Sequence, residues 1–262
     1  MSSRPVVLVT GAARRLGRAI VLDLAAHGFD VAIHHRFEHT SAAGEASDTL
    51  TQARALGATA HSFAADLADE AACRALVPAV LARFGRLDAI VNNASAFEDD
   101  NAQTFGYAAM DLHWRTNTGP AVLLAQALHQ HAVAADTRGC VVNLLDQKLW
   151  NLNPDYFSYT LSKAALQAAT VMLAQAFAPR LRVCGVAPGV TLPSGPMTDA
   201  EFAIAHRLTP LQRSSTPDDI ARAVRFMIES PAITGTTLLV DGGQHLNAQT
   251  RDVLHLAQAA PH

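Results

Sequence analysis

Short runs of β-branched and aliphatic residues alternate along most of the chain with longer stretches of helical periodicity. The short runs fall at residues 5–10, 31–34, 59–64, 89–91, 140–145, 181–187 and 236–240 and are typical of buried strands. The longer stretches fall at residues 19–26, 43–56, 71–84, 111–134 and 217–230, with one more after Asp146. Each crossover has roughly the length that a βαβ unit requires. The pattern therefore predicts an α/β fold, with one continuous parallel sheet covered by helices on both faces.

Two segments near the C-terminus depart from this alternation. Residues 190–213 contain Pro193, Ser194, Gly195 and Pro196 followed by a short helical piece, which predicts a lid over a site rather than a second domain. We therefore expect one domain over residues 1–245. The tail, residues 246–262, carries no pattern that places it.

Composition narrows the possible partners and the compartment. The 262 residues carry a net charge of −3, with no run of like charges that would favour nucleic acid or an anionic membrane. Cys73, Cys140 and Cys184 fall in no disulfide or metal spacing, which fits a reducing cytoplasm. The chain shows no signal-peptide pattern and no apolar stretch of about 18 residues, so we expect a soluble cytoplasmic protein. The twelve histidines lack partners at zinc-like spacing, and we expect no metal site.

The turn after the first strand has the composition of a phosphate-binding loop. It reads GAARRLG, with Gly11 and Gly17 flanking Arg15, and a helix follows at once. Glycines let backbone amides approach a pyrophosphate, and the helix N-terminus offsets its negative charge. The alternative is a plain connection between a strand and a helix.

The end of the second strand predicts which dinucleotide is bound. An acid there would bind the ribose 2′-hydroxyl, but the chain has His35 and Arg36, with no acid before Glu38. With Arg14 in the first turn, these residues favour the 2′-phosphate of NADPH over NADH, unless they are merely solvated loop charges. Asp66 follows the third strand and is expected either to bind the adenine amino group or to cap the next helix.

Tyr159 and Lys163 provide candidate chemistry. Their spacing of four residues places both on one face of a helix, where a fixed ammonium would lower the phenol pKa from its usual value of about 10. Such a tyrosine can act as a general acid. The alternative is a helix with one exposed lysine. Asn117, within the predicted helix 111–134, is a buried amide that needs a partner and can hold a water or a kinked backbone.

An ordered set of motifs over nearly the whole chain resembles the short-chain dehydrogenase/reductase family. The set comprises TGAARRLG at 10–17, DL at Asp66 and Leu67, NNAS at 92–95, Asn117, YTLSK at 159–163, PG at Pro188 and Gly189, and TGTTLLVDGG at 234–243. The resemblance implies a single Rossmann-like domain with a seven-stranded, doubly wound parallel sheet, a nicotinamide cofactor, a small-molecule substrate and a homotetramer or homodimer. It also implies that Tyr159 is the general acid, that Lys163 holds the nicotinamide ribose, and that Asn117 maintains a water relay to the lysine.

Asp146 is the main departure from the family pattern. Thirteen positions before the tyrosine the family usually has a serine that donates to a substrate carbonyl, whereas an ionised aspartate only accepts. The pteridine reductase branch has an aspartate there. The chain resembles that branch also in Arg14, Arg15 and Leu16, and in the N-A-S-x-F run whose Asn93, Ala94 and Ser95 are expected to contact the cofactor. A loop acid paired with Lys148 or Arg115 is the alternative for Asp146.

The resemblance to this branch implies a substrate and a set of contacts. Phe97 would stack on a flat pterin, Ser95 and Arg15 would contact pterin and phosphate, and Asp146 with Tyr159 would relay a proton to a ring nitrogen. The alternative for Phe97 is a core aromatic. We therefore predict an NADPH-dependent reductase of a dihydropterin-like nitrogen heterocycle. The alternatives are a carbonyl or alcohol oxidoreductase of the same fold and a non-catalytic NADP(H)-binding sensor.

Overall fold

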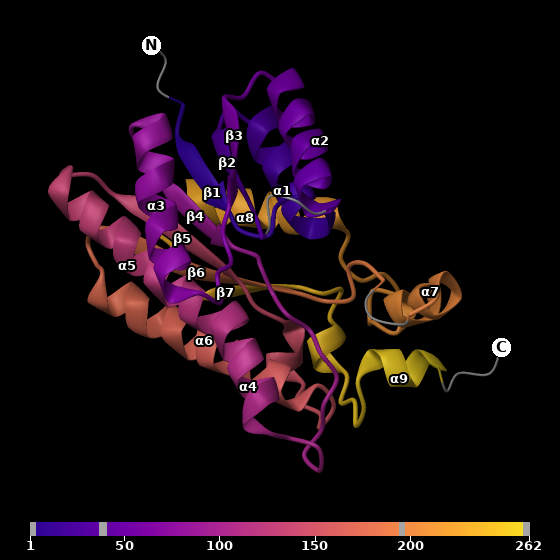
Figure 1. Ribbon diagram of the computed structural model, residues 1–262. Coiled ribbons are helices and arrows are strands. Elements are labelled where there is room, and N and C mark those ends of the chain that lie inside the picture. The colour runs from indigo at the N-terminus through magenta and orange to yellow at the C-terminus, as the bar shows by residue number, and fades with distance from the viewer. Residues whose placement is uncertain (1–3, 37–40, 194–196, 259–262) are drawn as a thin grey trace.

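The protein folds around one parallel sheet (Figure 1), and the computed structural model describes residues 4–36, 41–193 and 197–258. Glu38, Ser194, Gly195 and Pro196 lie outside these residues, as does the end of the predicted tail. The strands are β1 Val6–Val9, β2 Asp30–His35, β3 Ala60–Ala64, β4 Ala89–Asn92, β5 Gly139–Leu144, β6 Leu181–Pro188 and β7 Thr237–Val240. Their order is β3-β2-β1-β4-β5-β6-β7, and every pair is parallel. The seven-stranded Rossmann-like sheet is thereby confirmed.

Helices cover both faces of the sheet. They are α1 Arg15–Ala26, α2 Ser41–Ala55, α3 Glu70–Phe84, α4 Tyr107–His113, α5 Gly119–Ala134, α6 Phe157–Ala176, α7 Asp199–Arg207, α8 Pro217–Glu229 and α9 Val253–Gln258. Side chains of a strand alternate between faces. Thus Val7 and Val9 pack with α1, α2 and α8, while Val6 and Leu8 pack with α3, α5 and α6. Both core clusters are closed to solvent.

The predicted continuous helix over residues 111–134 is wrong. The helical segment begins earlier, with α4, and a π-helical turn, Trp114–Thr118, separates α4 from α5. Asn117 lies within this turn and is buried. A π-turn inserts an extra residue into the helix and is frequent at functional sites. Sequence periodicity does not reveal it, because the hydrophobic pattern continues through the turn.

The segment predicted to be a lid and the C-terminal tail contain short helices that pack together. A capping box of Thr198 and Glu201 starts α7 within the predicted lid, and another of Thr216 and Asp219 starts α8. The tail, which the sequence left unplaced, forms α9 beside α7 (Figure 1). Leu254 of this segment belongs to one buried cluster with residues of α7 and the start of α6.

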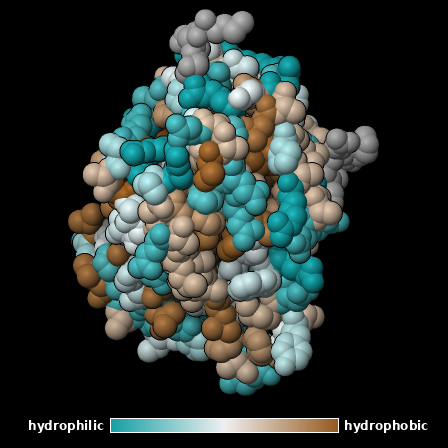
Figure 2. Space-filling model, turned by 90° about the vertical axis from the view of Figure 1, so that its left-hand side faces the viewer, coloured by the Kyte–Doolittle hydropathy of each residue, from teal (hydrophilic) through white to brown (hydrophobic). Residues whose placement is uncertain are grey.

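The face formed by α5 and α6 carries apolar side chains among polar ones (Figure 2). Val133, Leu161, Val171 and Met172 on these helices are more than 40% exposed, and Met172 reaches 67%. No helix in the described part of the chain is long and apolar enough to span a membrane.

Candidate active site

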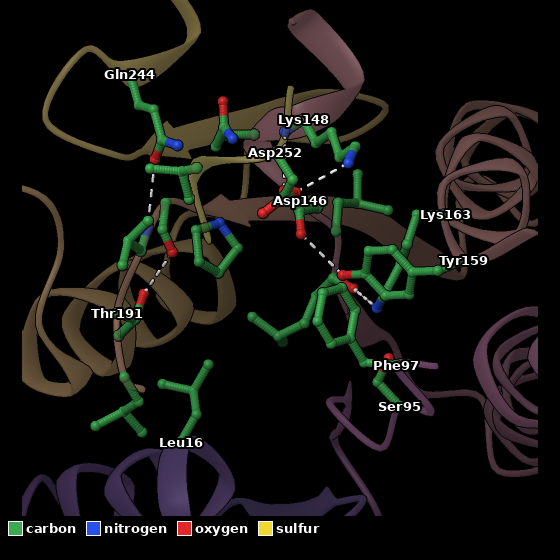
Figure 3. A pocket seen from close by; sticks show the side chains of 18 of the residues that line it. Leu16, Ser95, Phe97, Asp146, Lys148, Tyr159, Lys163, Thr191, Gln244 and Asp252 are labelled. Carbon is green, nitrogen blue, oxygen red and sulfur yellow. Dashed lines mark hydrogen bonds and ion pairs between the residues drawn. The ribbon is translucent and has the colours of Figure 1, made fainter. Parts of the chain in front are cut away.

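A cavity of about 290 Å³ lies at the carboxyl ends of β4, β5 and β6 (Figure 3). This is the edge at which open α/β sheets bind ligands. The structure brings ten predicted site residues to the cavity: Arg15, Leu16, Asn93, Ser95, Phe97, Asp146, Tyr159, Lys163, Pro188 and Gly189. Nine others do not line it: Gly11, Arg14, Gly17, His35, Arg36, Asp66, Leu67, Ala94 and Asn117.

The glycine turn is as tight as the sequence predicts. Gly11 has φ +60°, and a Cβ on Gly17 would lie 2.3 Å from the Gly11 carbonyl oxygen and 2.7 Å from Asn93 Nδ2. Only glycine therefore fits at position 17. His34, which sequence analysis missed, braces the turn: Gly11 N donates to His34 Nδ1 at 3.1 Å, so Nε2 carries the proton toward Ala65 O at 3.0 Å. Burial lowers the pKa of His34 to about 4, which keeps this acceptor neutral.

The turn after β4 is tied to the glycine turn. Thr10 Oγ1 accepts hydrogen bonds from the amides of Asn93 at 2.9 Å and Ala94 at 3.0 Å. Asn93 Nδ2 donates to the carbonyls of Thr10 at 2.8 Å and Gly11 at 3.1 Å. Asn93 therefore joins the ends of β1 and β4, the neighbouring strands at which the direction of strand order reverses. Such a tight, braced pair of loops fits a dinucleotide.

The charges at the end of β2 pair with acids of the chain. Arg36 lies 3.1 Å from Asp66, and Arg14 lies 3.7 Å from Glu45, with both arginine side chains more than 60% exposed. Asp69, rather than Asp66, caps α3, so the capping alternative for Asp66 is wrong. Asp66 and Arg36 lie together at the end of the site where the adenosine of a dinucleotide would lie.

Asp146 and Tyr159 form the central contact of the site. The Tyr159 hydroxyl donates to Asp146 Oδ2 at 2.8 Å, and Asp146 Oδ1 accepts from Lys148 N at 2.8 Å (Figure 3). The alternative of a loop acid in an ion pair with Lys148 or Arg115 is wrong, since Arg115 pairs with Asp111 and the Lys148 ammonium pairs with Asp252. Asp146 is thus held against the tyrosine by its own backbone turn.

The pKa values differ from the sequence-based expectation. Burial, with the nearby Asp146, raises the pKa of Tyr159 well above its usual value, whereas we expected Lys163 to lower it. Burial also raises the pKa of Asp146, and the Lys148 amide and the Tyr159 hydroxyl oppose that rise. The prediction failed because the phenol is buried and Asp146 contacts its hydroxyl at 2.8 Å, whereas the Lys163 ammonium lies 5.8 Å from the ring centroid. Both groups therefore retain protons more strongly than in water.

Lys163 and Asn117 contact backbone and side chains of the site. Lys163 Nζ donates to Leu144 O at 2.8 Å and lies 5.8 Å from the centroid of the Tyr159 ring. Burial lowers its pKa to about 8. Asn117 bonds to the amide and carbonyl of Ala96, at 2.7 and 3.1 Å, and to Ser162 Oγ at 3.0 Å. Asn117 thereby holds the loop that carries Ser95 and Phe97, and its water relay to Lys163 stays a prediction.

Phe97 belongs to an aromatic cluster at the cavity. Its ring stacks on Tyr156 with centroids 4.1 Å apart and meets the Tyr159 ring edge at 4.7 Å. Ser95 Oγ donates to Asn117 Oδ1 at 3.2 Å. Arg15 donates to Pro193 O at 2.6 Å, which places its guanidinium across the cavity beside the predicted lid. Phe97 is therefore both packed and in contact with the cavity.

Several lining residues escaped sequence analysis. Gln147 Oε1 and Gln244 Nε2 are buried without a hydrogen-bond partner among the described residues, and both residues line the cavity. The Gln244 orientation is set because its Oε1 accepts from Val190 N at 3.3 Å. Asp252 and Val253 come from the tail. These residues belong to no sequence motif, because they meet only where segments distant in sequence pack around the cavity.

The chain is similar to known reductases over most of its length. The family described as "Enoyl-(Acyl carrier protein) reductase" matches residues 11–245. Pteridine reductase 1 of Leishmania tarentolae is 32% identical and covers 92% of this chain and 96% of its own. The 3-oxoacyl-[acyl-carrier-protein] reductase FabG of Staphylococcus aureus is 31% identical, covering 91% and 97%.

A solved structure is similar over nearly the full length. FolM alternative dihydrofolate reductase 1 from Brucella canis, complexed with NADP, is 42% identical, with a TM-score of 0.86, and covers 96% of this chain and 98% of that chain. A glycine-turn dinucleotide site beside a buried tyrosine defines the class as a nicotinamide-dependent oxidoreductase. The chain belongs to the short-chain dehydrogenase/reductase family. Among the described residues, no group of three or more His, Cys, Asp or Glu side chains could hold a metal ion.

Proposed function

We propose that the protein is an NADPH-dependent reductase of a dihydropterin or a similar flat nitrogen heterocycle. The observation that carries this proposal is the buried Asp146 carboxyl group in contact with the Tyr159 hydroxyl at 2.8 Å. A carboxylate beside a carbonyl oxygen opposes the negative charge that carbonyl reduction develops, whereas it tolerates a ring nitrogen that gains a proton. The similarity to pteridine reductase 1 and to FolM supports the same substrate class.

Hydride transfer, proton delivery and cofactor orientation are assigned to different groups of the site. The nicotinamide, when bound, supplies the hydride to a ring carbon. Tyr159 and Asp146 share a proton along one hydrogen bond and deliver it to the adjacent ring nitrogen. Burial raises the pKa of Asp146, so this carboxyl group takes up a proton more readily than an exposed aspartate does. Lys163 orients the cofactor ribose, as the family resemblance implies.

The cavity has two halves in this proposal. The cofactor half comprises the glycine turn, Asn93 and the turn of Pro188 and Gly189. The substrate half comprises the side chains around Asp146, with Phe97 as the surface on which the heterocycle stacks. Stacking of this kind contributes about 1 kcal/mol beyond the buried area. Ser95 and Arg15 also line the cavity, and they are the side chains proposed to contact pterin and phosphate.

NADPH is the proposed cofactor. Arg36 at the end of β2 is the proposed partner of the 2′-phosphate, which would compete with Asp66 for the guanidinium. Arg14 adds a second cation nearby in the first turn. The NADP complexes of FolM from Brucella canis and Brucella suis support this assignment.

A carbonyl reductase is the second candidate, which the similarity to FabG favours. In that case Asp146 would be a tolerated replacement of the donor serine. A cofactor sensor is a third candidate, but it has no need for the buried tyrosine, aspartate and lysine together. We also propose a cytoplasmic homotetramer or homodimer, supported by the exposed apolar side chains of α5 and α6.

The substitution Asp146→Ser distinguishes the two reductases. The serine restores the hydroxyl that, in the family, donates a hydrogen bond to a substrate carbonyl, and it removes the carboxyl group. We expect the variant to lose turnover of 7,8-dihydrobiopterin and to gain turnover of simple ketones, both measured as NADPH oxidation. A variant that gains ketone reduction and keeps full pterin turnover contradicts the proposed substrate.

A further inference from the structure

The C-terminal segment reaches the cavity through a buried ion pair. Lys148, in the 3₁₀ turn Gln147–Trp150, is only 3% exposed. Its ammonium lies 2.9 Å from Asp252 Oδ2 and donates to Asp155 O at 2.7 Å. A buried ammonium needs such partners, because removing a charge from water costs several kcal/mol. The tail therefore supplies the counter-charge of a residue that lies far away in sequence.

Both members of this pair line the cavity (Figure 3). The backbone amide of Lys148 also donates to Asp146, the carboxyl group that contacts Tyr159. One residue thus connects the tail, through its side chain, with the central contact of the site, through its backbone.

Lys148 also supports the aromatic cluster. Its ammonium lies 5.4 Å from the centroid of the Tyr156 ring, within the range of a cation–π interaction. Tyr156 stacks on Phe97. A shift of the ammonium would therefore change the support of the ring that faces the substrate half of the cavity.

Further contacts fasten the tail to the same loop. Asp155 accepts from Arg251 Nε at 2.8 Å and from the amide of Asp252 at 2.7 Å. Asn151 exchanges hydrogen bonds with the backbone of Asn247 and Gln249. Residues 247–252 are thus held by residues 148–155, which lie between Asp146 and Tyr159, and α9 continues from them onto α7.

We propose that segment 247–258 forms a wall of the substrate half of the cavity, and that Lys148 is a positioning residue that holds this wall through Asp252. The proposal rests on the proposed function only in assigning this half to the substrate. Breaking one member of a buried ion pair is strongly unfavourable, whereas replacing both by apolar groups is often neutral. The pair therefore offers a test by single and double substitution.

The test compares Lys148→Met, Asp252→Leu and the double variant. Each single variant is expected to raise the KM for 7,8-dihydrobiopterin about tenfold or more, with the Kd for NADPH unchanged. Hydrogen exchange of segment 247–258 should accelerate in both. The double variant should restore slow exchange and reverse part of the rise in KM. Asp252→Asn, which preserves the size of the side chain, provides a milder variant if a single replacement does not fold.

Arg225→Met is the matched control. Arg225 forms a partly buried pair with Asp23 at 2.9 Å, between α8 and α1 and away from the cavity. The Arg225→Met variant should have a lower free energy of unfolding, with unchanged KM and unchanged hydrogen exchange in segment 247–258. Unchanged exchange of segment 247–258 in Lys148→Met would overturn the proposal, as would equal losses of NADPH and pterin binding. If the wild type reduces no pterin, the proposed function fails, while exchange still tests the role of the pair.

Discussion

The two halves of the cavity are built in different ways. The cofactor half consists of strand ends and short turns, joined by hydrogen bonds such as those from Asn93 to Thr10 and Gly11. The proposed substrate half consists of the loop after Asp146, the surroundings of Phe97 and the tail, joined by side-chain pairs such as Lys148 with Asp252. Backbone geometry dictates the first half, and packing between distant segments dictates the second.

This difference has a consequence for specificity. A tight turn with a glycine at φ +60° tolerates few substitutions, so the proposed dinucleotide site is constrained by the fold itself. Loops and tails tolerate change far better, because little of the sheet depends on them. Substrate choice can therefore vary on the same sheet while the cofactor site stays the same.

Tyr159→Phe should have the largest effect. The phenylalanine keeps the ring and its packing but removes the hydroxyl that donates to Asp146. We expect kcat to fall about 10²–10⁴-fold, as for loss of a general acid, with the Kd for NADPH unchanged. Steady-state kinetics and cofactor fluorescence titration measure the two quantities. Tyr156→Phe, on the neighbouring ring, is the control and should retain most turnover.

Asp146→Asn should lower pterin turnover about 100-fold without destabilising the fold. Burial raises the pKa of Asp146 in the folded state above its unfolded value, so ionisation of this carboxyl group lowers the free energy of unfolding. Its full contribution to stability is present below about pH 4 and is lost as the pH rises through the folded pKa. A neutral asparagine avoids this loss. Urea unfolding at pH 7 should therefore find the variant as stable as the wild type or more stable, and a marked loss of stability would contradict this explanation.

Gly17→Ala should damage the cofactor half alone. The added methyl group would overlap the Gly11 carbonyl at 2.3 Å, which costs about 1–3 kcal/mol of folding stability and opens the turn. We expect weaker NADPH binding by titration calorimetry. Gly44→Ala in α2 has open space around its Cβ and should instead stabilise by about 1 kcal/mol. Equal effects of the two substitutions would show that the turn is not constrained.

Arg36→Ala should have the smallest effect, on cofactor choice. Loss of a charged donor to the 2′-phosphate is expected to weaken NADPH binding about tenfold and to leave NADH binding nearly unchanged. The ratio of kcat/KM for the two cofactors measures the change. Arg74→Ala on α3, which breaks an exposed pair with Glu70, is the control. An equal loss of affinity for both cofactors would mean that Arg36 does not bind the 2′-phosphate.

Most of the fold could be predicted from the sequence, because apolar runs and helical periodicity directly reflect burial on a sheet. The helix around Asn117 could not, since a π-helical turn leaves the hydrophobic pattern almost unchanged. The position of α9 could not either, because short helices carry too few periodic residues to show a face. It packs on α7, which is distant in sequence.

The same limit applies to the site. Gly17, Tyr159 and Lys163 belong to motifs with fixed spacing, so their positions followed from the sequence. His34, Gln244 and Asp252 act through tertiary contacts that no spacing reveals. The expected lowering of the Tyr159 pKa failed for the same reason, since spacing alone does not report that Asp146 and burial act more strongly than Lys163.

The most direct test of the proposed activity is steady-state oxidation of NADPH by the purified protein. One set of reactions contains 7,8-dihydropterins, another contains simple ketones and aldehydes, and each is repeated with NADH. We expect turnover with dihydropterins and NADPH, and little with the other combinations. Turnover confined to ketones or aldehydes would contradict the role assigned to Asp146 and leave a carbonyl reductase as the function of this site.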